Sequence, residues 1–214
     1  MKKIKSFFLV CVVAMATRVE AQDIHWGFQG GLSLSGGIAK ETGVTIKGKP
    51  GLGFAFGVLG DYQLSNPKWS IRAGLTFQHE ASVADIFDDQ THIRVNYINL
   101  PIDLVWHPDF AQKRWVFGAG PWFAYGLSGK YTQDGATYSI EFGSSEANDA
   151  HRLDLGLDLM AGYKLNEDMM LTAKFDLGLK DVSAQPDFVT IHTGSFGVNF
   201  VYWMPTAVKI PGHK

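Results

Sequence analysis

The chain has 214 residues, of which 19% are charged and 24 are glycine. Soluble domains carry roughly 25% charged residues, so the composition leans away from an ordinary water-exposed surface. The length accommodates one domain of normal size, and the 21 acidic residues outnumber the 19 basic ones, so no excess of positive charge indicates a nucleic-acid partner.

Residues 1–21 have the layout of a cleaved secretory signal peptide. Three lysines among the first five residues precede an apolar run over 7–16, which is too short to span a bilayer, and the segment ends at the small residue Ala21. The leader contains the sole cysteine of the chain, Cys11, so the mature protein can form neither a disulfide scaffold nor a cysteine-ligated metal site. Cleavage before Gln22 removes four basic residues and one acidic residue, which leaves a net charge of −5.

After the leader, apolar residues alternate with small or polar residues in eight segments. This period of two is typical of β-strands with two unlike faces, whereas no apolar run approaches the ~20 residues of a membrane helix. The eight predicted strands cover residues 26–34, 52–62, 69–78, 98–106, 117–127, 152–163, 171–179 and 195–202. Eight is an even number, as closed bacterial barrels require.

The joins between these segments alternate between short and long. Tight turns are predicted at 65–68 and 166–168, and a slightly longer connection at 107–114. The other four joins are long and polar, and they cover residues 35–49, 79–94, 129–150 and 180–190. Short turns at one rim and long loops at the other are typical of an outer-membrane barrel.

A soluble ligand-carrying barrel would also alternate with a period of two, but its polar face would meet water and carry many Lys, Glu and Thr residues. Here the less apolar face consists mainly of Gly, Ala, Ser and Asn. A simple hairpin at 65–68 would place Asp61 opposite Arg72, and an inward pair of this kind would be mutually neutralised. We therefore predict a lumenal charge network, with an alternative in which some members point to solvent. Its members are Asp61, Arg72, Asp103, Asp154, Asp158, Lys174 and Asp176.

Large aromatic residues cluster near the strand ends at the short-turn side, which is typical of a girdle at a membrane interface. These residues are Trp26, Tyr62, Trp69, Trp106, Trp115, Tyr163, Tyr202 and Trp203. The fold class predicted from these patterns is an all-β, eight-stranded antiparallel up-and-down transmembrane β-barrel over residues 22–203, located in the outer membrane.

Three short stretches resemble the PorT-like outer-membrane β-barrel family of Bacteroidetes. Residues 97–102 (Tyr-Ile-Asn-Leu-Pro-Ile) are similar to a Tyr-Leu-Glu-Ile-Pro-Leu strand of that family, and residues 118–122 (Gly-Ala-Gly-Pro-Trp) to the Gly-x-Gly-Pro-aromatic strand that follows it. The opening stretch 28–33 (Phe-Gln-Gly-Gly-Leu-Ser) also fits. The resemblance implies an eight-stranded barrel inserted from the periplasm, and most members of the family have no assigned activity.

The last predicted strand resembles the assembly signal by which barrel assembly machinery recognises outer-membrane barrels. The positions that match are Ser195, Gly197, Phe200 and Tyr202. Such signals usually end the chain, whereas here a segment with two prolines, residues 204–214, follows. We expect this segment to be a periplasmic tail.

The sequence contains residue types for a metal site and for a hydrolytic site, but their patterns favour neither. In the segment 79–94, His92 with Asp88 or Asp89 could bind a divalent cation, but the spacing matches no defined site and an acidic solvated loop is the preferred interpretation. A hydrolytic site would need a serine and an oriented base, and no motif connects the candidate residues. These candidates are Ser139, Ser144, Ser145 and His151. No cofactor, metal or catalytic residue is predicted.

An eight-stranded barrel has a lumen only wide enough to be filled by side chains, so we predict a non-enzymatic protein with a plugged lumen and a structural or surface-interaction role. Its expected partners are outer-membrane lipid, the barrel assembly machinery and a protein that binds the long loops. The alternatives are a subunit of a secretion or assembly complex, since the named member of the resembled family is associated with secretion, and a soluble periplasmic ligand-binding barrel.

Overall fold

A computed structural model describes most of the mature chain. The described residues are 24–41, 44–86, 89–109, 113–143, 148, 150–183 and 189–205. The predicted signal peptide and all but the first two residues of the predicted tail lie outside this set, so both stay predictions.

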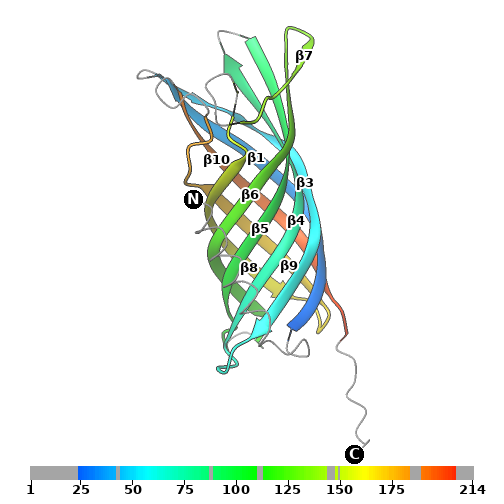
Figure 1. Ribbon diagram of the computed structural model, residues 1–214. Helices are drawn as coiled ribbons and strands as arrows, with labels where there is room; N and C mark the ends of the chain where they lie inside the picture. Colours follow the sequence, from blue (N-terminus) through cyan, green and yellow to red (C-terminus); the bar gives the residue numbers. More distant parts are fainter. Residues whose placement is uncertain are drawn as a thin grey trace, which may run out of the picture.

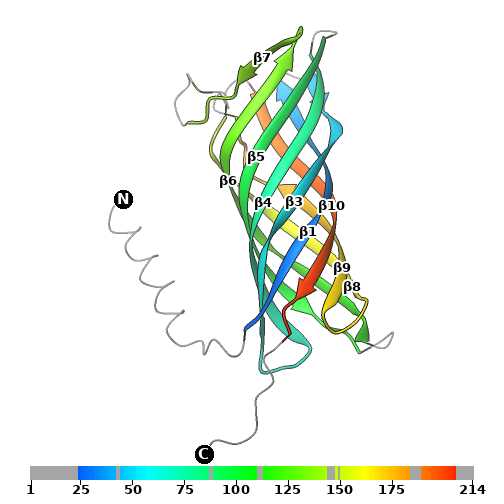
Figure 2. The same ribbon diagram turned by 90° about the vertical axis from the view of Figure 1, so that its right-hand side faces the viewer.

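Within the described residues the chain forms one closed antiparallel barrel (Figures 1 and 2). Each barrel strand pairs with its neighbours in sequence, and the last strand returns to pair with the first, from Gly27 opposite Trp203 to Glu41 opposite Val189. Two further short strands, β2 (Val44–Lys47) and β7 (Ala136–Ser139), extend the sheet beside β1 and β6. The eight strands of the barrel are β1 (Ile24–Glu41), β3 (Lys49–Gln63), β4 (Trp69–Ile86), β5 (Asp89–Trp106), β6 (Trp115–Gln133), β8 (Leu153–Lys164), β9 (Met169–Gly178) and β10 (Val189–Trp203). The predicted up-and-down barrel is confirmed.

The apolar face of every barrel strand points outward. In β8, Leu153, Leu155, Leu157 and Leu159 are exposed, whereas the polar and small residues between them are buried. Exposed fractions reach 65% for Leu52 on β3, and a soluble protein does not cover its outside with such side chains. This orientation rules out the soluble ligand-binding barrel, whose apolar face would point inward.

Several segments predicted as loops are continuations of strands. The segment 79–94 belongs to a long hairpin in which β4 and β5 remain paired up to Ile86 opposite Asp89. Likewise β1 extends to Glu41 and β6 to Gln133, and Figure 1 shows the β6–β7 extension projecting beyond the barrel wall at the rim opposite the short turns. The loop prediction was wrong here because polar and apolar residues are mixed on both faces of these strand extensions. Backbone pairing continues there without the hydrophobic contrast that reveals a strand in the sequence.

The aromatic side chains at the short-turn rim divide between the two faces. Trp26, Trp106 and Trp115 are exposed on the outside, as a girdle requires. Trp203 departs from the prediction: it is only 6% exposed and stacks on His25 with ring centroids 5.1 Å apart. Trp203 points inward because Tyr202 faces outward, and successive residues of a strand point to opposite faces.

The outward face predicts how a charge should act at different depths. Leu75 lies near the middle of the apolar part of β4. Ile71 is the next outward residue after Trp69, close to the short-turn rim. We expect Leu75→Arg to lower the free energy of unfolding in phospholipid vesicles by about 2–4 kcal/mol, and Ile71→Arg by about 0–1 kcal/mol. Urea titration of the refolded variants measures both values, and equal losses at the two positions would contradict the membrane orientation of this face.

Candidate functional site

The inside of the barrel is crowded, and its glycines are a consequence of that crowding. A Cβ atom placed on Gly57 would lie 2.7 Å from Cα of Thr76, and one on Gly120 would lie 2.8 Å from Cα of Asp103. Real Cβ atoms do not approach other carbons so closely, so larger residues at these positions would force the strands apart. The glycines therefore permit a narrow lumen, in which a limited number of large polar side chains fill the remaining space.

An ion pair occupies the end of the lumen near the short turns. Asp61 and Arg72 face each other across the β3–β4 hairpin, and Oδ2 of Asp61 accepts hydrogen bonds from Nη2 at 2.6 Å and Nε at 2.9 Å. The guanidinium lies over the ring of Trp203, 4.9 Å from its centroid, and Nη1 is 3.4 Å from the sulfur of Met160. Arg72 thus joins β3, β4, β8 and β10 across the barrel, with only 4% of its surface exposed.

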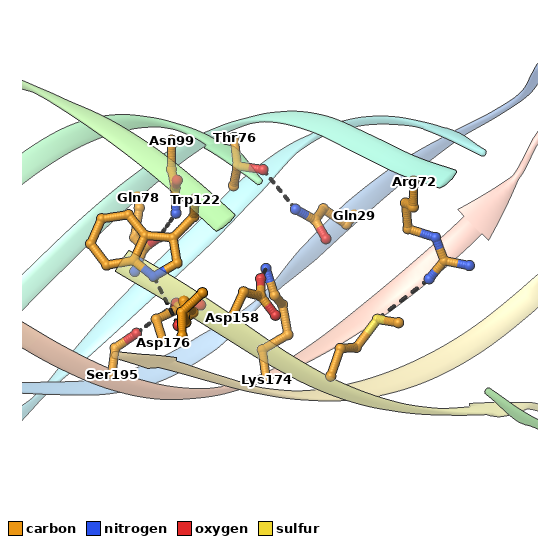
Figure 3. A network of polar contacts seen from close by, with 12 residues as sticks. Gln29, Arg72, Thr76, Gln78, Asn99, Trp122, Asp158, Lys174, Asp176 and Ser195 are labelled. Atoms are coloured by element: carbon orange, nitrogen blue, oxygen red, sulfur yellow. Dashed lines mark hydrogen bonds and ion pairs between the residues drawn. The ribbon is translucent and has the colours of Figure 1, made fainter. Parts of the chain in front are cut away.

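A second cation occupies the middle of the lumen. Nζ of Lys174 on β9 forms an ion pair with Asp158 on β8, a residue with no exposed surface. The same ammonium group interacts electrostatically with Asp103 and Asp176. Figure 3 shows Asp158 and Lys174 lying between Trp122 and Arg72 along the barrel. One lysine therefore serves three buried carboxylates, which makes it the central positive charge of the lumen.

The carboxylates nearer the opposite rim are held by hydroxyl groups. Oδ2 of Asp176 accepts a hydrogen bond from Ser195 at 2.9 Å (Figure 3), and Oδ2 of Asp154 accepts one from Thr193 at 2.7 Å. Asp154 also accepts the backbone N–H of Leu155 at 2.7 Å. Hydrogen bonds to the charged form stabilise a carboxylate that has lost part of its hydration.

Sequence reasoning missed Glu80, which it had assigned to a solvated loop. The structure places it on the lumenal face of β4, where its carboxylate accepts a hydrogen bond from Nε2 of Gln78 at 2.8 Å. Oε1 of Gln78 in turn accepts a hydrogen bond from Asn99 at 3.2 Å. The signal was available, because Glu80 has the same parity on β4 as Arg72.

All seven residues of the predicted charge network occupy inward positions, and two pairs of them form ion pairs. Trp122 also lies inside, where its Nε1 donates to the carbonyl of Leu157 at 3.1 Å (Figure 3). The combined effect of these contacts on stability stays a prediction. The inward residues of the network are Asp61, Arg72, Asp103, Asp154, Asp158, Lys174 and Asp176.

Along the described strands the space inside the barrel is broken into small voids. Three lumenal cavities have volumes of about 10–20 Å³, enough for roughly one water molecule each. A cavity of about 300 Å³ opens at the short-turn end, where Arg72, Trp203 and Asp61 close it off from the middle of the barrel. Burial and the nearby positive charge of Lys164 lower the pKa of His107 in the wall of this cavity. The arrangement can hold water at one mouth and offers no continuous path through the barrel.

Of the three candidate metal ligands, only the side chain of His92 lies in the part of the chain that the structure describes. In the part of the chain that the structure describes, no three His, Cys, Asp or Glu side chains are placed to hold a metal ion. His92 is exposed on the outside of β5, whereas Asp88 and the side chain of Asp89 lie outside the described set.

Of the four candidate residues for hydrolysis, the structure describes Ser139 and His151, and these two form no hydrogen bond with each other. Nδ1 of His151 lies 3.1 Å from the carbonyl oxygen of Gly143, and Ser139 is exposed on β7. Ser144 and Ser145 lie outside the described residues.

The four residues that resemble an assembly signal alternate across β10. Ser195 and Gly197 face the lumen, and Phe200 and Tyr202 face outward with exposed fractions of 42% and 37%. Recognition of these residues by assembly machinery stays a prediction.

Comparison with known proteins finds one matching family model and several similar solved structures. The model of the family described as "Outer membrane protein beta-barrel domain" matches residues 20–184. Neisserial surface protein A, from Neisseria, is 10% identical with a TM-score of 0.49, covering 82% of this chain and 96% of its own. OprG of Pseudomonas aeruginosa is 11% identical with a TM-score of 0.48, covering 84% and 95%. Ail of Yersinia pestis is 14% identical with a TM-score of 0.40, covering 83% and 98%.

No curated protein matches the chain in sequence. The described residues contain no helix that is long and apolar enough to cross a membrane. The family match spans well over half of the chain and agrees with the closed antiparallel barrel and its apolar outer face. The chain therefore belongs to the outer membrane protein beta-barrel domain family and is a protein of the outer membrane, which it crosses with β-strands.

Proposed function

We propose that this protein is a non-catalytic outer-membrane barrel with a sealed lumen, which reinforces the envelope and presents rigid hairpins to a partner at the cell surface. The observation that carries the proposal is the filled middle of the lumen, where the ion pairs of Arg72 and Lys174 and the ring of Trp122 leave water-sized voids. A barrel without a channel must act through its outer surface or its ends.

The end opposite the short turns supports a surface role. The β4–β5 hairpin stays paired to its tip, and β7 folds back on β6 with Tyr131 stacked on Tyr138 at 5.2 Å. Tyr138 keeps 51% of its surface exposed, and exposed tyrosines on a fixed backbone suit protein contacts. Long loops of outer-membrane barrels face the exterior, so this end is the one available to an external partner.

A role as a subunit of a secretion or assembly complex is the second candidate. It rests on the resemblance of residues 97–102 and 118–122 to the PorT-like family, and membership of that narrower family stays a prediction. Such a subunit would make its contacts largely at the periplasmic rim, where the cavity of about 300 Å³ lies.

Because the lumen is sealed, we expect the barrel not to conduct ions. In planar bilayers that contain the refolded full-length protein, we expect no steady single-channel conductance, because Arg72 and its partners close the lumen. A heat-dependent shift in gel mobility on the same preparation serves as the control for correct folding. A large, stable conductance would overturn the proposal.

The central lysine predicts a large effect on stability. We expect Lys174→Met to lower the free energy of unfolding by about 3–5 kcal/mol, because it leaves the buried Asp158 carboxylate without its cation. The double variant Lys174→Met with Asp158→Asn removes the charges of the ion pair and should recover part of the loss, since Asp103 and Asp176 keep their charges. Urea unfolding in vesicles measures the free energies of unfolding of both variants. A single variant as stable as the unaltered protein would refute the network.

Site-specific photocrosslinking in intact cells separates the two candidate functions. A crosslinking residue at Tyr138 reports partners at the outer end, and one at Glu167, in the β8–β9 turn, reports partners at the periplasmic end. We expect protein adducts at Tyr138 and none at Glu167. Adducts at Glu167 alone would favour the complex subunit, and the absence of adducts at both positions would contradict a surface-interaction role.

A further inference from the structure

The outside of the barrel carries a polar row that crosses three neighbouring strands. His79 on β4 lies opposite Asn96 on β5, which in turn lies opposite Ser128 on β6. Nδ1 of His79 is 2.7 Å from Oδ1 of Asn96, and Nδ2 of Asn96 donates to Oγ of Ser128 at 2.9 Å. Side chains at such opposed positions share a face of the sheet, so the three form one hydrogen-bonded row on the outer surface.

The height of this row locates the outer boundary of the hydrocarbon region. Trp69 and Trp106 form an opposed pair at the short-turn rim, and ten residues separate Trp69 from His79, as they do Trp106 from Asn96. At about 3.3 Å per residue and a strand tilt of about 40°, ten residues rise roughly 25 Å, which equals the usual height of the apolar band. The outward residues in between carry no charge on either strand; they are Ile71, Ala73, Leu75, Phe77, Ile98, Leu100, Ile102 and Leu104.

Two cations lie directly above this boundary. Arg94 on β5 is opposite Lys130 on β6, in the next outward row after Asn96 and Ser128, and both residues are exposed. Two residues of a tilted strand rise about 5 Å, so both cations sit at the depth of lipid headgroups. Like charges at opposed positions of a sheet repel each other, and among the described residues neither cation has an acidic partner. The pair is thus placed where a bound anion would relieve the repulsion.

The outward surface below the pair suits acyl chains: on β5 and β6, Ile98 lies opposite Tyr125 and Leu100 opposite Phe123. An aromatic group lies beside this surface on β3 and β4. Phe54, Phe56 and Phe77 form an outward aromatic group with ring centroids 5.2–6.4 Å apart, and Phe54 also stacks on His79 at 5.2 Å. The outer face of β3–β6 therefore runs from an apolar aromatic surface, through a polar row, to a pair of cations. This is the order of a phospholipid or glycolipid read from its tails to its phosphate.

We propose that Arg94 and Lys130 bind a phosphate group of a phosphorylated glycolipid in the outer leaflet. The guanidinium of Arg94 can donate two parallel hydrogen bonds to one phosphate, and the ammonium of Lys130 adds a second charge from the neighbouring strand. The hydroxyl of Ser128 and the amide of Asn96 lie one row below, within the zone where sugar hydroxyls would lie. An extracellular polyanion is less suited, because the pair sits at the membrane surface, below the tips of the β4–β5 and β6–β7 hairpins.

The test compares matched charge-removing variants of the full-length protein in detergent. Binding of bis-phosphorylated lipid A, its dephosphorylated form and a soluble sulfated oligosaccharide is measured by native mass spectrometry and by the shift in melting temperature. The variant is Arg94→Gln with Lys130→Gln, and the control is Lys113→Gln with Arg114→Gln, which removes two exposed cations at the periplasmic rim.

We expect the bis-phosphorylated lipid to bind the Arg94/Lys130 variant about thirtyfold more weakly than the unaltered protein, since each cation near anionic lipid contributes about a factor of five. The control variant should bind as the unaltered protein does, and the dephosphorylated lipid should bind all three proteins equally weakly. Unchanged binding in the Arg94/Lys130 variant would overturn the proposal. Binding of the soluble oligosaccharide as tight as that of the lipid would overturn it as well, because the site would then recognise an extracellular polyanion.

Discussion

The pairing of β10 with β1 is the constraint on which the rest of the structure depends. In hydrocarbon no water is available to satisfy backbone N–H and C=O groups, so a sheet that crosses a membrane must have no free edge. The fifteen opposed residue pairs between Gly27 and Glu41 on β1 and Trp203 and Val189 on β10 remove both edges together. Closing a sheet of eight strands leaves a narrow interior, and this narrowness sets the chemistry of the inward face.

That interior accepts small residues nearly everywhere and large ones only in a few places. Where Gly57 and Gly120 bring neighbouring strands close together, no side chain fits. The remaining space is filled by polar and charged side chains that form hydrogen bonds and ion pairs with one another. Burying Arg72 and Lys174 is tolerable because each cation meets a carboxylate within the barrel. The same contacts that stabilise the closed sheet also block it, so the sealed lumen follows from how the barrel is held together.

The outer surface is apolar where the interior is polar, because it contacts lipid over a height of about 25 Å and water beyond that height. Charged side chains are absent between Trp69 and His79 on the outward face of β4, and on the neighbouring β5 the first outward residue beyond Asn96 is Arg94. The pairing register of β4, β5 and β6 therefore places Arg94 and Lys130 at that boundary. The long hairpins continue past it as paired strands, which keeps residues such as Tyr138 at fixed positions outside the membrane.

The alternation of residues along the chain determined the strands within the membrane, their inward and outward faces, and the opposition of Asp61 and Arg72, because a tight turn dictates register over a few residues. It could not reveal that the strands continue through 79–94, since polar and apolar residues mix on both faces there and hydrophobic contrast disappears. Only the tertiary structure decided which distant groups meet: that Lys174 pairs with Asp158, that Gln78 connects Glu80 with Asn99, and that Trp203 covers Arg72. Contacts across the lumen depend on the stagger of all eight strands together, and this stagger cannot be predicted from any single segment of the sequence.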